Sequence, residues 1–126
     1  MKLFALKEVF GNDKMFALRK VFVQYQGDNK IAYWLSRLYK DIEKINKDTT
    51  REIQGLVKDK TGEEVNVIIE KHLGGEVEIK NYINLFPLKM ENLNIKLIPA
   101  EIEALRFLLD VSEFEAEMDQ GGKHGN

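Results

Sequence analysis

The chain has 126 residues, of which 44% are hydrophobic and 32% are charged, and its formal net charge is −2. This length is sufficient for one domain with a buried core, and the composition is that of a globular chain rather than a disordered one. The chain has no cysteine, which excludes disulfides, thiolate nucleophiles and cysteine-ligated zinc or iron–sulfur sites. No apolar run approaches the ~20 residues that cross a bilayer, and charge interrupts the N-terminal residues too early for a signal peptide. We therefore expect no membrane contact and a cytoplasmic location.

The N-terminal region contains an internal repeat. Residues 2–10 (KLFALKEVF) and residues 14–22 (KMFALRKVF) are identical at six of nine positions. Residues 11–13 (GND) between them provide a helix stop followed by a helix cap, so each copy is predicted as a short amphipathic helix. One interpretation is a tandem duplication that added a helix to the fold, since two copies are too few for a solenoid. The alternative is a detachable segment that docks on a groove or on another subunit.

The longest predicted element is a helix over residues 29–58. Its mainly apolar stripe recurs at alternating steps of four and three, which keeps one side toward a partner helix: Ile31, Leu35, Leu38, Ile42, Ile45, Thr49, Glu52 and Leu56. Thr49 and Glu52 match a capping box and allow a break. Because the heptad phase continues and no proline or glycine occurs before Gly55, we predict a continuous helix. The turn at residues 26–29 predicts an antiparallel hairpin between this helix and the second repeat copy.

Shorter elements are predicted downstream. Residues 61–73 form an amphipathic helix that ends at Gly74 and Gly75. Residues 76–80 and 94–97 alternate between apolar and polar side chains and are predicted to pair as two antiparallel strands. Residues 99–118 form the closing helix, with Pro99 in its first turn.

The closing helix has more apolar surface than one packing face requires. Its second apolar lobe indicates either deep burial or contact with another subunit. The candidate subunit interface is Phe107, Val111, Phe114 and Met118.

The sequence contains no recognisable catalytic, cofactor-binding or metal-binding motif. Ser36 and Ser112 are outside any glycine-rich elbow, and no histidine pair has the spacing of a zinc or di-iron site. Phosphate-binding glycine loops are also missing from the sequence. His72 lies on the apolar face of its helix, near the helix end, and is interpreted as a packing residue. We expect a protein that is not an enzyme and has no cofactor.

A basic stripe on the long helix is the strongest positive signal. Lysine and arginine recur every seven residues at Lys30, Arg37, Lys44, Arg51 and Lys58. Such a stripe can follow a phosphate backbone, with Arg37, Lys44 and Arg51 as candidate phosphate contacts. The carboxylates that flank the stripe weaken its field, and any solvated helix face has a similar composition. A solvated face is the preferred interpretation.

The order of elements resembles a family of small uncharacterised proteins of tailed phages and prophages of Gram-positive bacteria. The shared pattern is a short helix around residues 17–18, then residues 32–38 (AYWLSRL) at the start of a long charged helix, residues 76–79 (EVEI) and residues 95–105 (IKLIPAEIEAL). The resemblance covers about residues 15–110. It implies a phage accessory or morphogenesis protein and provides no catalytic residues.

We therefore expect a mainly helical α+β fold: an antiparallel helical hairpin with a long central helix, a short two-stranded antiparallel ribbon and a closing C-terminal helix. One domain spans residues 1–118, made of the duplicated segment (1–13), the hairpin (14–60) and the remaining elements (61–118), before a disordered tail (119–126). The expected function is non-enzymatic protein interaction or assembly through helix faces, as a homo-oligomer or with another phage or host protein in a bacterial host cell. The alternatives are a nucleic-acid-associated accessory protein that uses the basic stripe, and an inhibitor of a host protein.

Overall fold

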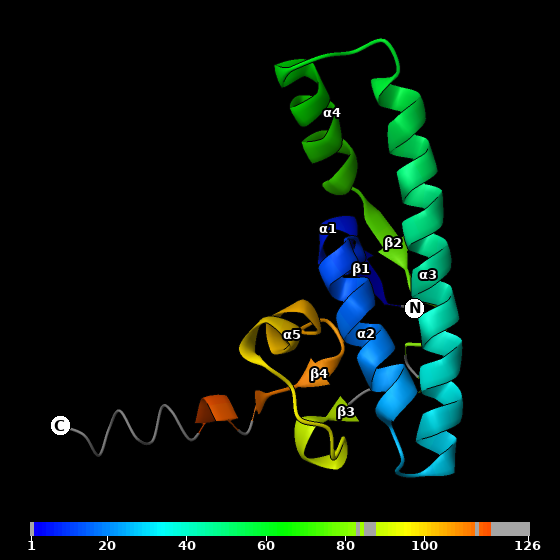
Figure 1. Cartoon of the computed structure of the whole chain (residues 1–126), viewed down its shortest axis with the longest axis vertical. Helices are drawn as coiled ribbons and strands as arrows, with labels where there is room; N and C mark the ends of the chain where they lie inside the picture. Colours follow the sequence, from blue (N-terminus) through cyan, green and yellow to red (C-terminus); the bar gives the residue numbers. More distant parts are fainter. Residues whose placement is uncertain (1, 83, 85–87, 113, 117–126) are drawn as a thin grey trace, which may run out of the picture.

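The computed structural model describes residues 2–82, 84, 88–112 and 114–116, and it shows a mainly helical α+β chain (Figure 1). The helices are α1 (Leu6–Val9), α2 (Asn12–Gln24), α3 (Asn29–Val57), α4 (Glu63–Leu73), the 3-10 helix η1 (Met90–Asn92) and α5 (Pro99–Ala104). The strands are β1 (Leu3–Ala5), β2 (Glu76–Glu78), β3 (Leu88–Lys89) and β4 (Leu109–Asp110). The fold class predicted from the sequence is confirmed. The predicted disordered tail, 119–126, lies outside the described residues.

Helix α3 is continuous over 29 residues, as predicted, and runs along one side of the whole molecule (Figure 1). Its start is fixed by Asp28, whose side chain accepts hydrogen bonds from the backbone N–H groups of Lys30 and Ile31, at 2.7 and 3.3 Å. Thr49 is buried in the helix interior and does not cap a new helix. The heptad pattern therefore predicted the helix correctly through this position.

Helix α2 lies between α3 and α5 and forms the expected antiparallel hairpin with α3 (Figure 1). Its inner face buries Ala17, Leu18 and Val21 against the central core. On the α5 side, the Lys20 ammonium lies 2.8 Å from a carboxylate oxygen of Glu101. Helix α2 is thus fixed on both sides.

The two repeat copies adopt different structures, so the prediction of a helix for each copy is wrong for the first. The second copy is entirely helical within α2, whereas the first begins as β1 and continues as the single turn α1. Phe4 is 6% exposed in the first copy, and its counterpart Phe16 is 72% exposed. Because the first copy contributes Phe4, Leu6 and Val9 to the core, it is an integral part of the fold.

Asn46 of α3 holds the junction between the two copies. Its side-chain oxygen accepts a hydrogen bond from the backbone N–H of Gly11 at 2.9 Å, and its side-chain nitrogen donates to the carbonyl of Val9 at 3.1 Å. Gly11 has φ 136°, and a Cβ there would lie 2.6 Å from a carboxylate oxygen of Asp13. The sharp change of direction between α1 and α2 therefore requires glycine.

The predicted pairing of residues 76–80 with residues 94–97 is wrong. Strand β2 pairs antiparallel with β1, in a register that places Phe4 opposite Val77, and residues 94–97 form neither strand nor helix. Both central side chains face the core, where the Phe4 ring packs edge-on against Tyr82 with centroids 4.7 Å apart. Burial raises the pKa of the Tyr82 phenol above its ordinary value.

The closing helix is shorter than predicted. Helix α5 ends at Ala104, and the chain then turns and forms β4, which pairs in parallel with β3. The residues of this turn, Leu105, Phe107 and Leu108, are buried together with Leu109 of β4. A helix that rests on one layer can bury only one stripe, so burial of this nearly continuous run favours a turn over a helix.

The core is concentrated beside the N-terminal half of α3. Its last apolar contribution from α3 is Ile45, and Leu73 at the end of α4 packs against it, although α4 has no fully buried residue. Residues 46–57 of α3 and helix α4 extend beyond this core as a pair, which we call the arm (Figure 1). In the described part of the chain, no helix combines the length and apolar character required to span a bilayer.

Candidate functional site

The candidate site is a hollow along the arm. A groove of about 730 Å³ lies between α3 and α4 and reaches the first residue of α1 and strand β2. Its apolar lining comes from four elements: Leu6, Ile45, Leu56, Ile68 and Val77. We call this hollow the arm groove.

The arm groove follows from the sequences of the two helices that form it. On α4, the first turn carries Glu63 and Glu64 and the last turn carries Lys71 and His72, an arrangement that matches the helix dipole. The apolar face of this helix turns toward α3, which is the element that α4 mainly contacts among the described residues. Leu56 remains 49% exposed although it belongs to the same stripe as the buried Leu38.

Polar side chains also line the arm groove, and most of the charged ones are acidic. They are Asp48, Thr49, Glu52, Lys71, His72 and Glu76. Three carboxylates and one lysine give these lining residues a net charge of −2 when the histidine is neutral. An apolar surface with charged edges is typical of the surfaces that bind amphipathic helices.

His72 joins the two helices of the arm. Its Nε2 atom lies 2.9 Å from a carboxylate oxygen of Glu52, on the groove side of both helices. The sequence indicated that His72 is a helix-end packing residue, and the structure places it at the end of α4 in contact with α3. Among the described residues, we find no group of three or more histidine and carboxylate side chains arranged to hold a metal ion.

The candidate subunit interface of the closing helix is dispersed in the structure. Phe107 is buried in the core, with its ring centroid 6.2 Å from that of Phe4, and is therefore not on the surface. Val111 and Phe114 line a shallow hollow with Met90 and Ile102. Met118 lies outside the described residues. The structure thus leaves only part of this set on a common surface.

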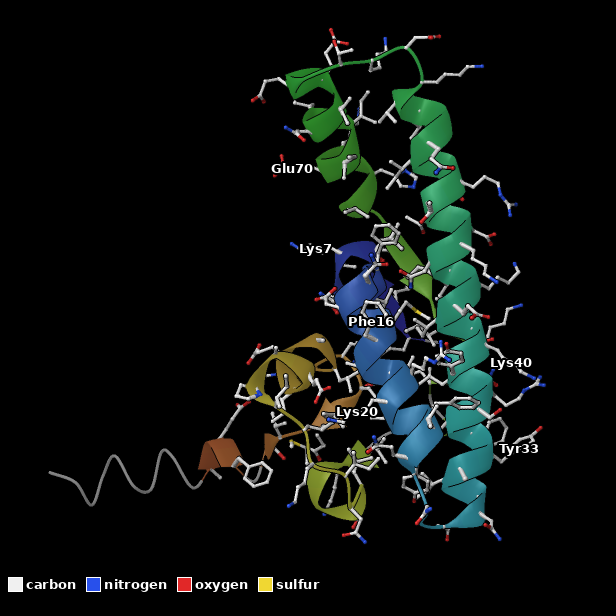
Figure 2. All side chains as sticks on the ribbon, viewed as in Figure 1. Lys7, Phe16, Lys20, Tyr33, Lys40 and Glu70 are labelled. Atoms are coloured by element: carbon white, nitrogen blue, oxygen red, sulfur yellow. The ribbon has the colours of Figure 1, made fainter. Side chains whose placement is uncertain are left out.

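The three candidate phosphate contacts, Arg37, Lys44 and Arg51, are all exposed on α3. Lys44 forms an ion pair with Asp48 at 3.3 Å, one turn along the helix. Figure 2 shows the neighbouring Lys40 on the side of α3 that faces away from α2 and α4. The three basic side chains are therefore exposed, although Arg51 also lines a hollow with Asn12 and Met15 of α2. The carboxylate of Asp48 partly neutralises the charge of Lys44, as expected.

Sequence reasoning did not detect the arm groove or the contact between Glu52 and His72. The available signal was the change within the α3 stripe, where a leucine and isoleucine pattern becomes Thr49 and Glu52. Such a change indicates that the stripe leaves the core at this point.

Neither a protein-family model nor a curated protein nor a solved structure matches this chain.

Proposed function

We propose that this protein is a non-enzymatic interaction or assembly protein of the phage or prophage type, which acts through helix faces and associates with copies of itself in the bacterial cytoplasm. The arm groove carries the proposal. It combines the exposed Leu56 of α3 and the half-buried Ile68 of α4 with charged edges, and apolar patches with polar rims are characteristic of protein-binding surfaces.

The burial pattern of α4 supports this function. This 11-residue helix has no fully buried residue although five of its residues are valine, isoleucine or leucine. A helix that only stabilised its own domain would place these side chains in the core. The phage assignment rests on the sequence resemblance over about residues 15–110.

The proposal is tested with two matched substitutions in the arm. Leu56→Glu introduces a charge inside the arm groove at a residue that is 49% exposed, so the fold should tolerate it. Val67→Glu introduces the same charge on α4 at a residue that is 59% exposed and does not line the arm groove. Light scattering over a range of concentrations should show self-association for the wild type and Val67→Glu, and a monomer for Leu56→Glu. A wild type that remains monomeric throughout would contradict the proposal.

The alternative function assigns the basic stripe of α3 to nucleic acid. It is favoured by the exposure of Arg37 and Arg51, for which the described residues provide no ion pair. Phosphate binding by this stripe would appear as salt-dependent affinity for a labelled duplex. No binding at low ionic strength would exclude it. The second alternative, inhibition of a host protein, would use the same arm groove with a different partner.

A further inference from the structure

Helix α2 carries an exposed stripe that the fold does not use. Phe16, Arg19 and Val23 lie on one helix face because they are separated by three and four residues. Phe16 is 72% and Val23 is 66% exposed, and Arg19 between them is also exposed. We call these three residues the α2 stripe. Figure 2 labels Phe16 together with Lys20, which lies one turn further along α2.

The internal repeat places one aromatic residue in the core and leaves its counterpart in this stripe exposed. The equivalent residue of the first copy, Phe4, already occupies the core position against Tyr82 and Phe107. Phe16 has no such core position. Helix α2 begins at Asn12, so Phe16 is helical and faces away from the core. An exposed aromatic residue on a rigid helix is typical of an interface anchor.

The α2 stripe and the arm groove are complementary in polarity, charge and length. Two apolar side chains of the stripe match the apolar lining of the groove, which includes Leu56 and Ile68. Arg19 gives the stripe one positive charge, and the groove lining has a net charge of −2 with a neutral histidine. The other two basic residues of α2, Lys14 and Lys20, already form ion pairs with Asp13 and Glu101. At about 1.5 Å per residue, the stripe spans roughly 10 Å and the 11 residues of α4 roughly 16 Å.

We propose that the arm groove of one copy receives the α2 stripe of a second copy. Phe16 and Val23 then cover the apolar lining, and Arg19 faces the acidic edge at Asp48 and Glu52. The inference rests on the proposed function and names the partner surface. Because the two surfaces differ, the contact is head-to-tail, and repeated contacts produce a ring or an open chain of subunits.

A mixing experiment tests this contact. Phe16→Glu removes the stripe but leaves the groove intact, and Leu56→Glu removes the groove but leaves the stripe intact. Each variant alone should be monomeric in light scattering. An equimolar mixture should form a 1:1 dimer, because it retains one intact groove and one intact stripe. The measured mass should rise from the 14.6 kDa of one chain to twice that value.

Charge complementarity is tested separately with Arg19→Glu, which should weaken self-association about tenfold by placing like charges together at the groove edge. Val67→Glu serves as the control that retains assembly. Circular dichroism confirms folding of each variant, and Val23→Glu provides a second stripe variant if Phe16→Glu does not fold.

The outcomes separate this inference from the proposed function. If Leu56→Glu abolishes self-association and Phe16→Glu does not, the groove binds another surface: the inference is overturned and the proposed function stands. A mixture that remains monomeric also overturns the inference, because it indicates a self-complementary contact. If the wild type does not self-associate at any concentration, both proposals fail.

Discussion

At the scale of single residues, Glu101 shows how one carboxylate connects separate parts of the chain. Its Oε1 atom accepts hydrogen bonds from the Lys20 ammonium at 2.8 Å and from the backbone N–H of Ile98 at 2.9 Å. The hydrogen bond from Lys20, together with that from Ile98, holds the pKa of Glu101 below its ordinary value. The same atom therefore fixes α2 against α5 and satisfies a donor at the start of α5.

This depressed pKa predicts a pH-dependent contribution to stability. The stabilisation is fully present above the pKa of Glu101 in the unfolded chain and is lost as pH falls through its lower pKa in the folded chain. Glu101→Gln should therefore lower the melting temperature at pH 7, and the difference from the wild type should be smaller at about pH 3. Thermal unfolding followed by circular dichroism at both pH values measures this difference. Equal melting temperatures at pH 7 would show that the pair adds no stability.

Residue contacts of this kind are only partly predictable from sequence. The cap at Asp28 is local and was recognisable from the turn that precedes α3. The contacts of Asn46 with Gly11 and of Glu52 with His72 join residues that are 35 and 20 positions apart. No periodicity encodes such pairs, because each depends on how two elements pack.

At the scale of elements, the two repeat copies show how tertiary contacts change the secondary structure of nearly the same sequence. Leu6 and Val9 in the first copy and Leu18 and Val21 in the second are all buried, because both pairs lie in helical turns. The copies diverge at the preceding residues, where β2 pairs with the first copy and not with the second. Nearly identical residues thus form a strand or a helix according to the available partner.

The duplicated phenylalanines provide a matched prediction. Phe4→Ala should reduce the free energy of unfolding by about 3–5 kcal/mol, because it leaves a cavity beside Tyr82 and Phe107. Phe16→Ala should change it by less than about 0.5 kcal/mol, because this side chain is 72% exposed. Urea unfolding at a protein concentration below self-association measures both. Equal effects of the two substitutions would contradict the placement of the first copy in the core.

Elements with a strong local pattern were predicted correctly, and those that depend on tertiary contacts were not. The heptad pattern of α3 was sufficient to predict a continuous helix, since a long periodic stripe is a strong local signal. The partner of β2 was missed because Leu3–Ala5 has the same residue pattern as a helical segment. The closing helix was predicted too long because Leu105 and its neighbours also fit a helical wheel, although the core buries them in a turn.

At the scale of the whole molecule, the arm should be less stable than the rest of the chain. Helix α4 packs against α3 and has no buried residue, whereas α2 lies between α3 and α5. Local stability follows the amount of buried apolar contact. Amides of α4 should therefore exchange with solvent at least about tenfold faster than those of α2 under native conditions. Hydrogen exchange followed by mass spectrometry compares the two helices directly, and equal protection would refute this ranking.

The continuity of α3 also has a geometric consequence. The helix has no proline, and its first glycine is Gly55, so it connects the core to the arm without an interruption that would favour bending. The 12 residues from Asn46 to Val57 extend for about 18 Å at 1.5 Å per residue. In the proposed head-to-tail assembly, the length of this segment would set the distance between the cores of successive subunits.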